Sequence, residues 1–177
     1  MFDGVDDERV LSYMEALRGA ESTNLTFVIK KNKSGISGFL HSLTLGPEPL
    51  LRACFFLREN GAVVSCIARA SPAAGGAAGA VHGGLIASLV DQACGIAAFG
   101  SGIIGVTLRL SLNFRKLLPW GQWFEVTARL GSRSGNKLNV TCTVHEVGDE
   151  TKPFVEAESL FLQRDRDFIS GKVKSNL

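Results

Sequence analysis

The stretch GGLIASLVDQACGIAAF, residues 83–99, decides the fold of this chain. Its apolar residues recur on nearly every side of a helix, and many of its residues are small. A helix of this kind is buried on most sides, because no side of it is suited to water. Gly100 and Gly102 come next and predict the end of the helix. The segment therefore predicts one long helix at the centre of a domain.

Strand patterns lie on both sides of this helix. Residues 50–58 and 62–70 precede it, and Asn60-Gly61 between them is a strong type I′ hairpin signal. Four strands are predicted after it, at residues 106–115, 122–130, 137–147 and 153–163. The first of these alternates strictly, which predicts that Thr107, Arg109, Ser111, Asn113 and Arg115 share one face. The order predicts an α+β hotdog fold, a six-stranded antiparallel sheet around one buried helix.

The 177 residues suit one domain with an extension. Residues 1–49 are interpreted as an N-terminal helical extension and linker, residues 50–164 as the hotdog domain, and residues 165–177 as a polar tail. Within the extension, residues 5–18 have helical spacing, with Val10, Leu11, Met14 and Leu17 on one face.

Composition narrows the classes of function. Hydrophobic residues make up 45% and the net charge is +2, so we expect a globular protein without nucleic-acid binding. No apolar run reaches the length of a membrane span, and the acidic start has no signal-peptide pattern. We therefore expect a location in the cytoplasm or the mitochondrial matrix. The four cysteines form no CxxC pair, which favours buried free thiols over a metal site.

Two features at the central helix are candidates for a catalytic role. His82-Gly83-Gly84 opens the helix, where backbone N–H groups lack internal partners and favour negative charge. Such a helix start can hold an oxyanion. Asp91 interrupts the apolar run about two turns later, where a carboxylate is costly unless it is paired or used. Two simpler interpretations stay open: Asp91 on the one polar stripe of the helix, and His82 as a helix cap.

Together, His82-Gly83-Gly84 and Asp91 resemble the HGG…D motif of the PaaI-type hotdog acyl-CoA thioesterases. Thr107, Asn113, Arg115 and the Gly135 turn continue the match, which is most similar to the branch of thioesterase superfamily members 4 and 5. The resemblance spans about residues 50–162.

This resemblance implies hydrolysis of a fatty-acyl-CoA or a related acyl-CoA by a homodimer or a dimer of dimers, with active sites at the subunit interface. Asp91 would be general base or nucleophile, and Thr107 would position water from across the interface. The Gly83 N–H would polarise the thioester carbonyl, with Gly84 nearby and His82 orienting the loop. Substrate contacts are implied for Asn113, Arg115, Asn136 and Lys137, although solvated turn charges explain these four equally well. Coenzyme A belongs to the substrate, and no other cofactor is expected.

One departure from the family keeps two alternatives open. Some members carry an Asn or Gln shortly before HGG that contacts the carbonyl, whereas residues 73–80 are all Ala and Gly. A non-catalytic acyl-CoA-binding or regulatory module is therefore the main alternative. A hotdog acyl-thioester dehydratase ranks lower, because its histidine base is expected on the helix and His82 precedes it.

Overall fold

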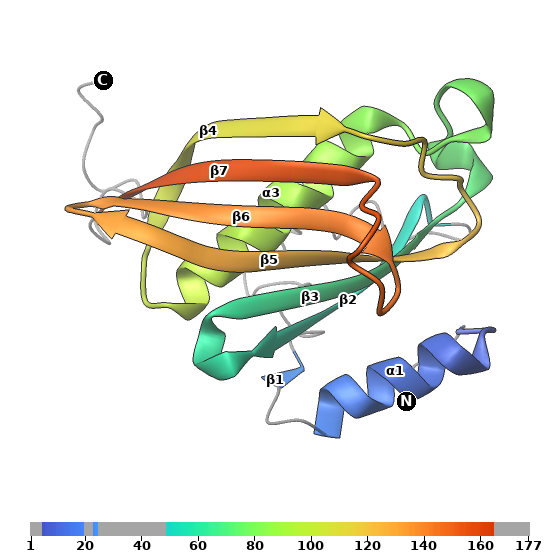
Figure 1. Ribbon diagram of the computed structural model, residues 1–177, viewed down its shortest axis with the longest axis horizontal. Coiled ribbons are helices and arrows are strands. Elements are labelled where there is room, and N and C mark those ends of the chain that lie inside the picture. The colour runs from blue at the N-terminus through green and yellow to red at the C-terminus, as the bar shows by residue number, and fades with distance from the viewer. Residues whose placement is uncertain (1–4, 20–22, 25–48, 165–177) are drawn as a thin grey trace.

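The computed structural model describes residues 5–19, 23–24 and 49–164 and has the predicted hotdog fold. Helix α3 (Gly83–Gly100) lies against one face of an antiparallel sheet in the order β1-β2-β3-β5-β6-β7-β4 (Figure 1). The six long strands are β2 (Leu51–Arg58), β3 (Val63–Ala70), β4 (Gly105–Phe114), β5 (Trp123–Ser134), β6 (Lys137–Glu146) and β7 (Val155–Gln163). The short β1 (Thr23–Asn24) adds a seventh strand from the predicted extension, and the predicted tail lies outside the described residues.

The inner face of the sheet and α3 form the main core. Leu89, Val90, Ala93 and Ala97 of α3 are buried against the apolar residues of every long strand. Burial of these side chains is the main driving force for wrapping the sheet around the helix. The length and composition of α3 would also suit a membrane span, but here its apolar residues are those of a domain core.

A second, smaller core lies on the outer face of the sheet. The predicted N-terminal helix is present as α1 (Glu8–Gly19), which Asp7 caps by accepting a bond from the Arg9 N–H at 3.0 Å. Its buried face consists of Val10, Met14 and Leu17, which pack against Cys54, Phe56 and Ile67. A one-sided apolar helix thus covers β2 and β3 from outside (Figure 1).

A β-bulge breaks the strict alternation predicted for β4. Thr107 pairs with Phe161 of β7, but Arg109 pairs with the next residue, Leu160, so that Leu108 is the extra residue. Phe161 faces α3, and Thr107 therefore also faces α3. The prediction that Thr107 and Arg109 share a face was wrong, because one extra residue reverses the alternation.

The predicted hairpin joins β2 to β3, with Arg58 opposite Val63. Its turn spans four residues rather than two, and Glu59, Asn60 and Gly61 all have positive φ. Gly61 is required there, because a Cβ would lie 2.8 Å from the Gly100 carbonyl oxygen at the end of α3. The hairpin therefore packs directly on the central helix.

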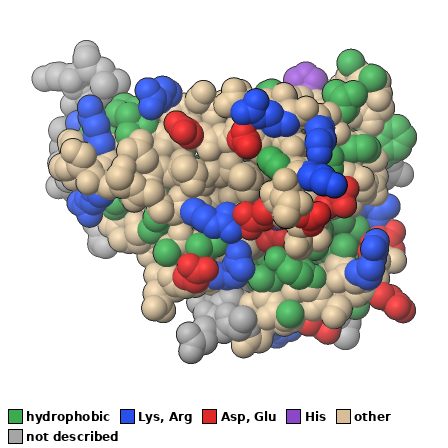
Figure 2. Space-filling view, in the orientation of Figure 1, with side chains coloured by type: hydrophobic (Ala, Val, Ile, Leu, Met, Phe, Trp, Pro, Cys, Tyr) green, Lys and Arg blue, Asp and Glu red, His purple; other side chains and the backbone are tan. Residues whose placement is uncertain are grey.

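The four cysteines are free and buried, as predicted. On the face of the molecule in Figure 2, basic and acidic side chains lie intermixed. This mixture agrees with the small net charge of +2.

Candidate active site

Asp91 and Thr107 form a hydrogen-bonded pair within one chain. Asp91 lies half-buried in the third turn of α3, and the Thr107 hydroxyl donates to its Oδ1 at 2.9 Å. The β4 bulge makes this contact possible, because it turns Thr107 toward the helix. The sequence-based expectation placed Thr107 across a subunit interface from Asp91. In the structure the two side chains instead contact each other within one chain.

His82 caps α3, as one interpretation of the sequence predicted. Its backbone is extended (φ −60°, ψ 129°) and its Nδ1 accepts a hydrogen bond from the Gly84 N–H at 3.0 Å. The Gly84 amide is therefore engaged by the cap. Among the described residues, the Gly83 N–H has no acceptor. Gly83 thus supplies the free donor at the positive end of the helix dipole.

The carboxylate and the free amide are far apart within one chain. Eight residues of α-helix separate Gly83 from Asp91, which corresponds to roughly 12 Å along the axis. One thioester carbon cannot contact both groups at that distance. A single chain therefore holds two half-sites, one at each end of β4. Thr107, at its start, contacts Asp91. The ring of Phe114, at its end, would be 3.3 Å from a Cβ on Gly83.

A pocket of about 580 Å³ adjoins the Gly83 half-site. Its walls include Ile86 and Leu118, and Arg115 and Lys116 also line it. Phe114 lines it too and is 55% exposed, which is unusual for a large ring on the helix side of a strand. Sequence reasoning missed Phe114 as a site residue, although it had considered Lys116 as a cation for the phosphates of coenzyme A. The phenylalanine at the end of the alternating strand, just ahead of Arg115 and Lys116, was the available signal.

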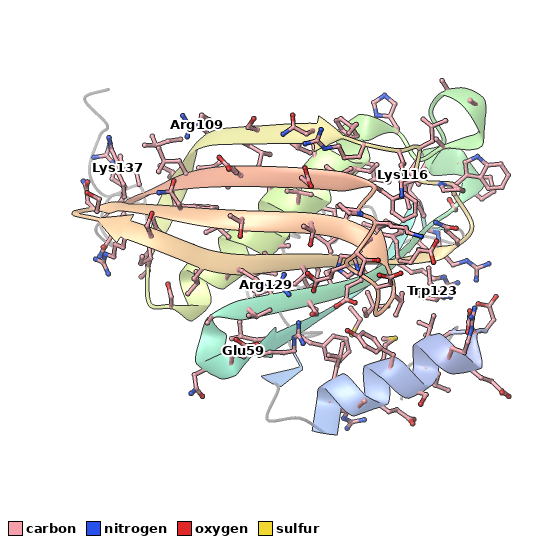
Figure 3. The ribbon with its side chains drawn as sticks, in the orientation of Figure 1. Glu59, Arg109, Lys116, Trp123, Arg129 and Lys137 are labelled. Atoms are coloured by element: carbon pink, nitrogen blue, oxygen red, sulfur yellow. The ribbon has the colours of Figure 1, made fainter. Side chains whose placement is uncertain are left out.

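The four predicted substrate contacts divide into two groups. Asn113 and Arg115 lie at the end of β4, where the Arg115 guanidinium pairs with Glu156 at 2.7 Å. Asn136 and Lys137 lie at the β5–β6 turn. Figure 3 shows Lys137 and Lys116 at opposite ends of the sheet. One chain therefore does not bring all four residues to one place.

The loop before His82 contains two short 3₁₀ turns, Pro72–Ala74 and Ala77–Gly79. It offers no polar side chain to the Gly83 half-site between residues 73 and 80. Backbone bonds hold it, among them His82 N–H to the Ala74 carbonyl at 3.0 Å and Val81 N–H to the Leu118 carbonyl at 2.7 Å. The donor geometry at Gly83 depends on the backbone of this loop.

The segment that contains these residues is similar to known proteins. Residues 78–152, which contain both half-sites, match the family model described as the thioesterase superfamily. Over these residues the chain is similar to the thioesterase superfamily. The acyl-coenzyme A thioesterase THEM4 of Rattus norvegicus is 36% identical over 92 residues, which are 52% of this chain and 39% of the relative. The chain thus spans about two-fifths of the length of that curated relative.

Solved structures share the fold of this domain. The PaaI protein of E. coli has a TM-score of 0.56 at 14% identity and covers 65% of this chain and 80% of its own. The smu.793 protein of Streptococcus mutans, solved bound to acetyl CoA, has a TM-score of 0.56 at 20% identity and covers 72% of this chain and 97% of its own. At these identities the likeness concerns the fold.

Proposed function

We propose that this hotdog domain hydrolyses acyl-CoA thioesters, with Asp91 as general base or nucleophile. The observation that carries the proposal is the Thr107–Asp91 bond of 2.9 Å, which fixes one carboxylate oxygen. The free Gly83 N–H supplies an oxyanion donor, and THEM4 is named an acyl-coenzyme A thioesterase. In the general-base form, water adds its oxygen to the acyl carbon as Asp91 takes its proton, the C–S bond breaks, and the leaving thiolate of coenzyme A takes that proton. A thiolate leaves readily, so one carboxylate and one oxyanion donor suffice.

The complete site is proposed to form between two copies of the chain. β4 is the edge of the sheet, with ten residues and no partner on its outer side among the described strands. Antiparallel pairing of two β4 edges brings the start of one strand beside the end of the other. Thr107 and Asp91 of one copy then meet Gly83 and Phe114 of the other. The 12 Å gap within one chain is closed in this way.

The same pairing would also bring together the two groups of predicted substrate contacts. Asn136 and Lys137 lie at the Thr107 end of the sheet in each copy, because Lys137 and Val106 both pair with Leu162 of β7. In an antiparallel pair, this end meets the Arg115 and Lys116 end of the second copy. Cations from both copies then surround one substrate and suit the phosphates of coenzyme A.

Thiol release from an acyl-CoA panel tests the proposal. Asp91→Asn is expected to lower kcat by about 10²–10⁴-fold, the usual range for a lost general base, with the circular dichroism spectrum unchanged. Glu158→Gln is the matched control, since it neutralises an exposed carboxylate on the outer face of the sheet. Turnover of Asp91→Asn at the wild-type rate would remove Asp91 from the mechanism.

The non-catalytic alternative keeps specific support. The loop before His82 has no polar side chain for the carbonyl, and the cap occupies the Gly84 amide. Under that alternative, wild-type protein binds acyl-CoA in calorimetry but releases no thiol from any member of the panel. The assay therefore separates an enzyme from a binding module.

A further inference from the structure

The N-terminal segment, residues 5–19, lies on the outer face of the sheet, opposite α3. It nevertheless contacts Arg69, the first residue in a series of contacts that ends at the candidate active site. Asp6 accepts two hydrogen bonds from the Nη1 of Arg69, at 2.7 and 2.6 Å. The Trp123 indole N–H donates to the same carboxylate at 3.2 Å, and the Arg69 guanidinium carbon lies 5.8 Å from the Trp123 ring centre. Figure 3 shows Trp123 above the first turn of α1. Arg69 is therefore held from two sides.

Arg69 in turn holds the segment that enters β5. Its Nε donates to the Gly121 carbonyl at 2.6 Å, and the Gly121 N–H donates to the Ala70 carbonyl at 2.8 Å. Gly121 has a φ of +86°. The guanidinium thus uses Nη1 for Asp6 and Nε for Gly121, a fixed separation of donors that a lysine ammonium cannot reproduce.

Residues 118–121 support the loop that leads to Gly83. The Leu118 carbonyl accepts from the Val81 N–H at 2.7 Å, Pro119 forms a β-bridge with Ala80, and the Trp120 N–H donates to the Gly79 carbonyl at 3.3 Å. The Trp120 indole also packs beneath the loop, 3.5 Å from where a Cβ on Gly75 would lie. A continuous set of contacts therefore runs from Asp6 through Arg69 and Gly121 to Gly83.

The loop needs this external support because of its composition. Residues 73–80 contain only Ala and Gly, which supply no large side chain to pack and leave the backbone many alternative conformations. The oxyanion donor at Gly83 follows this loop by three residues. A donor must keep its position to within about half an ångström to stabilise a transition state.

We propose that Arg69 is a positioning residue for the Gly83 oxyanion donor, and that Asp6 gives the N-terminal segment a part in turnover by holding Arg69. This inference rests on the proposed thioesterase function. Hydrogen bonds from Arg69 and Trp123 lower the pKa of Asp6 to about 2, so that the contact persists at neutral pH. Both side chains are partly exposed and contribute little to global stability. Effects on turnover are therefore separable from unfolding.

Steady-state kinetics gives the first test. Arg69→Ala is expected to lower kcat about tenfold with KM changed less than about twofold, in keeping with a displaced donor. Asp6→Asn should lower kcat about threefold, and Asp6→Asn should add nothing in the Arg69→Ala background. Arg9→Ala is the matched control, because it removes the other arginine of this region that pairs with an N-terminal aspartate. Independent, multiplying effects of Asp6→Asn and Arg69→Ala would overturn the coupling.

Hydrogen–deuterium exchange without substrate gives a readout that does not depend on the proposed function. In Arg69→Ala, amides of residues 72–84 should exchange at least about threefold faster while those of β6 and β7 keep their rates. Unchanged exchange in residues 72–84, or a loss of kcat that only follows a loss of folded protein, would overturn the inference. If wild-type protein releases no thiol but exchange still rises in Arg69→Ala, the thioesterase proposal fails and the structural coupling stands.

Discussion

Helices α1 and α3 pack on opposite faces of the same sheet. They differ in how far packing against that sheet explains their residues. The charged residues of α1 are exposed, and Val10, Met14 and Leu17 are buried against the sheet, so that packing accounts for its main pattern. Helix α3 is apolar nearly all round but still places a carboxylate, Asp91, half-buried at the edge strand. Packing gives no reason for that carboxylate. Helix α1 therefore completes the fold, whereas α3 also positions a candidate catalytic carboxylate.

After Asp91→Asn, the largest expected effect comes from removing the free amide at the start of α3. Gly83→Pro deletes the N–H and keeps the helix, because the first helical position accepts proline and the extended backbone of His82 suits a residue before proline. Loss of one oxyanion donor should lower kcat by about 10²–10³-fold. Gly83→Ala is the paired variant, which keeps the N–H but approaches the Phe114 ring at 3.3 Å. Thiol release should fall far more in Gly83→Pro than in Gly83→Ala.

Hybrid dimers show whether the two half-sites come from different chains. A purified hybrid of one Asp91→Asn copy and one Gly83→Pro copy contains one intact site if Asp91 and Gly83 meet across the interface. Such a hybrid should regain about half of the wild-type turnover. No recovery in a verified hybrid would place both groups in one chain and contradict the pairing of β4 edges.

A smaller effect is expected at Thr107, on the strand beside α3. Thr107→Val keeps the shape but removes the hydroxyl that donates to Asp91, which should lower kcat by about ten- to a hundredfold, the cost of a lost charge-assisted bond. Thr107→Ser keeps the donor and should retain most of the activity. Equal rates for the valine and serine variants would mean that the hydroxyl has no part in turnover.

The fold followed from sequence because its signals are periodic. The apolar residues 83–99 predicted α3, and Val10, Met14 and Leu17 predicted the buried face of α1. Periodicity also caused the main error, since a single extra residue at Leu108 is invisible in an alternating pattern and yet turns Thr107 to the other face. A bulge is stabilised by pairing with β7, which lies 50 residues further along the chain.

The residues of the candidate site could be proposed from the sequence, but their arrangement could not. His82, Gly83, Gly84 and Asp91 were identified from their spacing, and the structure places His82 as the cap. The separation of roughly 12 Å between Gly83 and Asp91 follows from the helical rise, but the sequence analysis did not take it into account. It also gave no sign that Arg69, at the end of β3, reaches both Asp6 and Gly121. Contacts of this kind depend on side-chain reach across the sheet, which no local pattern encodes.

The smallest expected effect concerns α1 and is a spectroscopic one. Tyr13 is the single tyrosine of the sequence, so phenolate absorbance reports on it alone. Its hydroxyl donates to Glu125 at 3.4 Å, and burial together with that carboxylate raises the pKa of Tyr13 to about 12. Because the folded chain favours the protonated phenol, α1 docking is fully stabilised below about pH 10, the pKa of a free tyrosine, and weakens as pH rises toward 12.

Met14→Asp should undock α1 and return the titration midpoint of Tyr13 to about 10. Glu125→Gln should lower that midpoint only partly, since burial is the larger cause of the raised pKa. A wild-type midpoint of about 10 would show that α1 does not hold Tyr13 against the sheet. The contrast between the two helices would then lose the part that rests on the packing of α1.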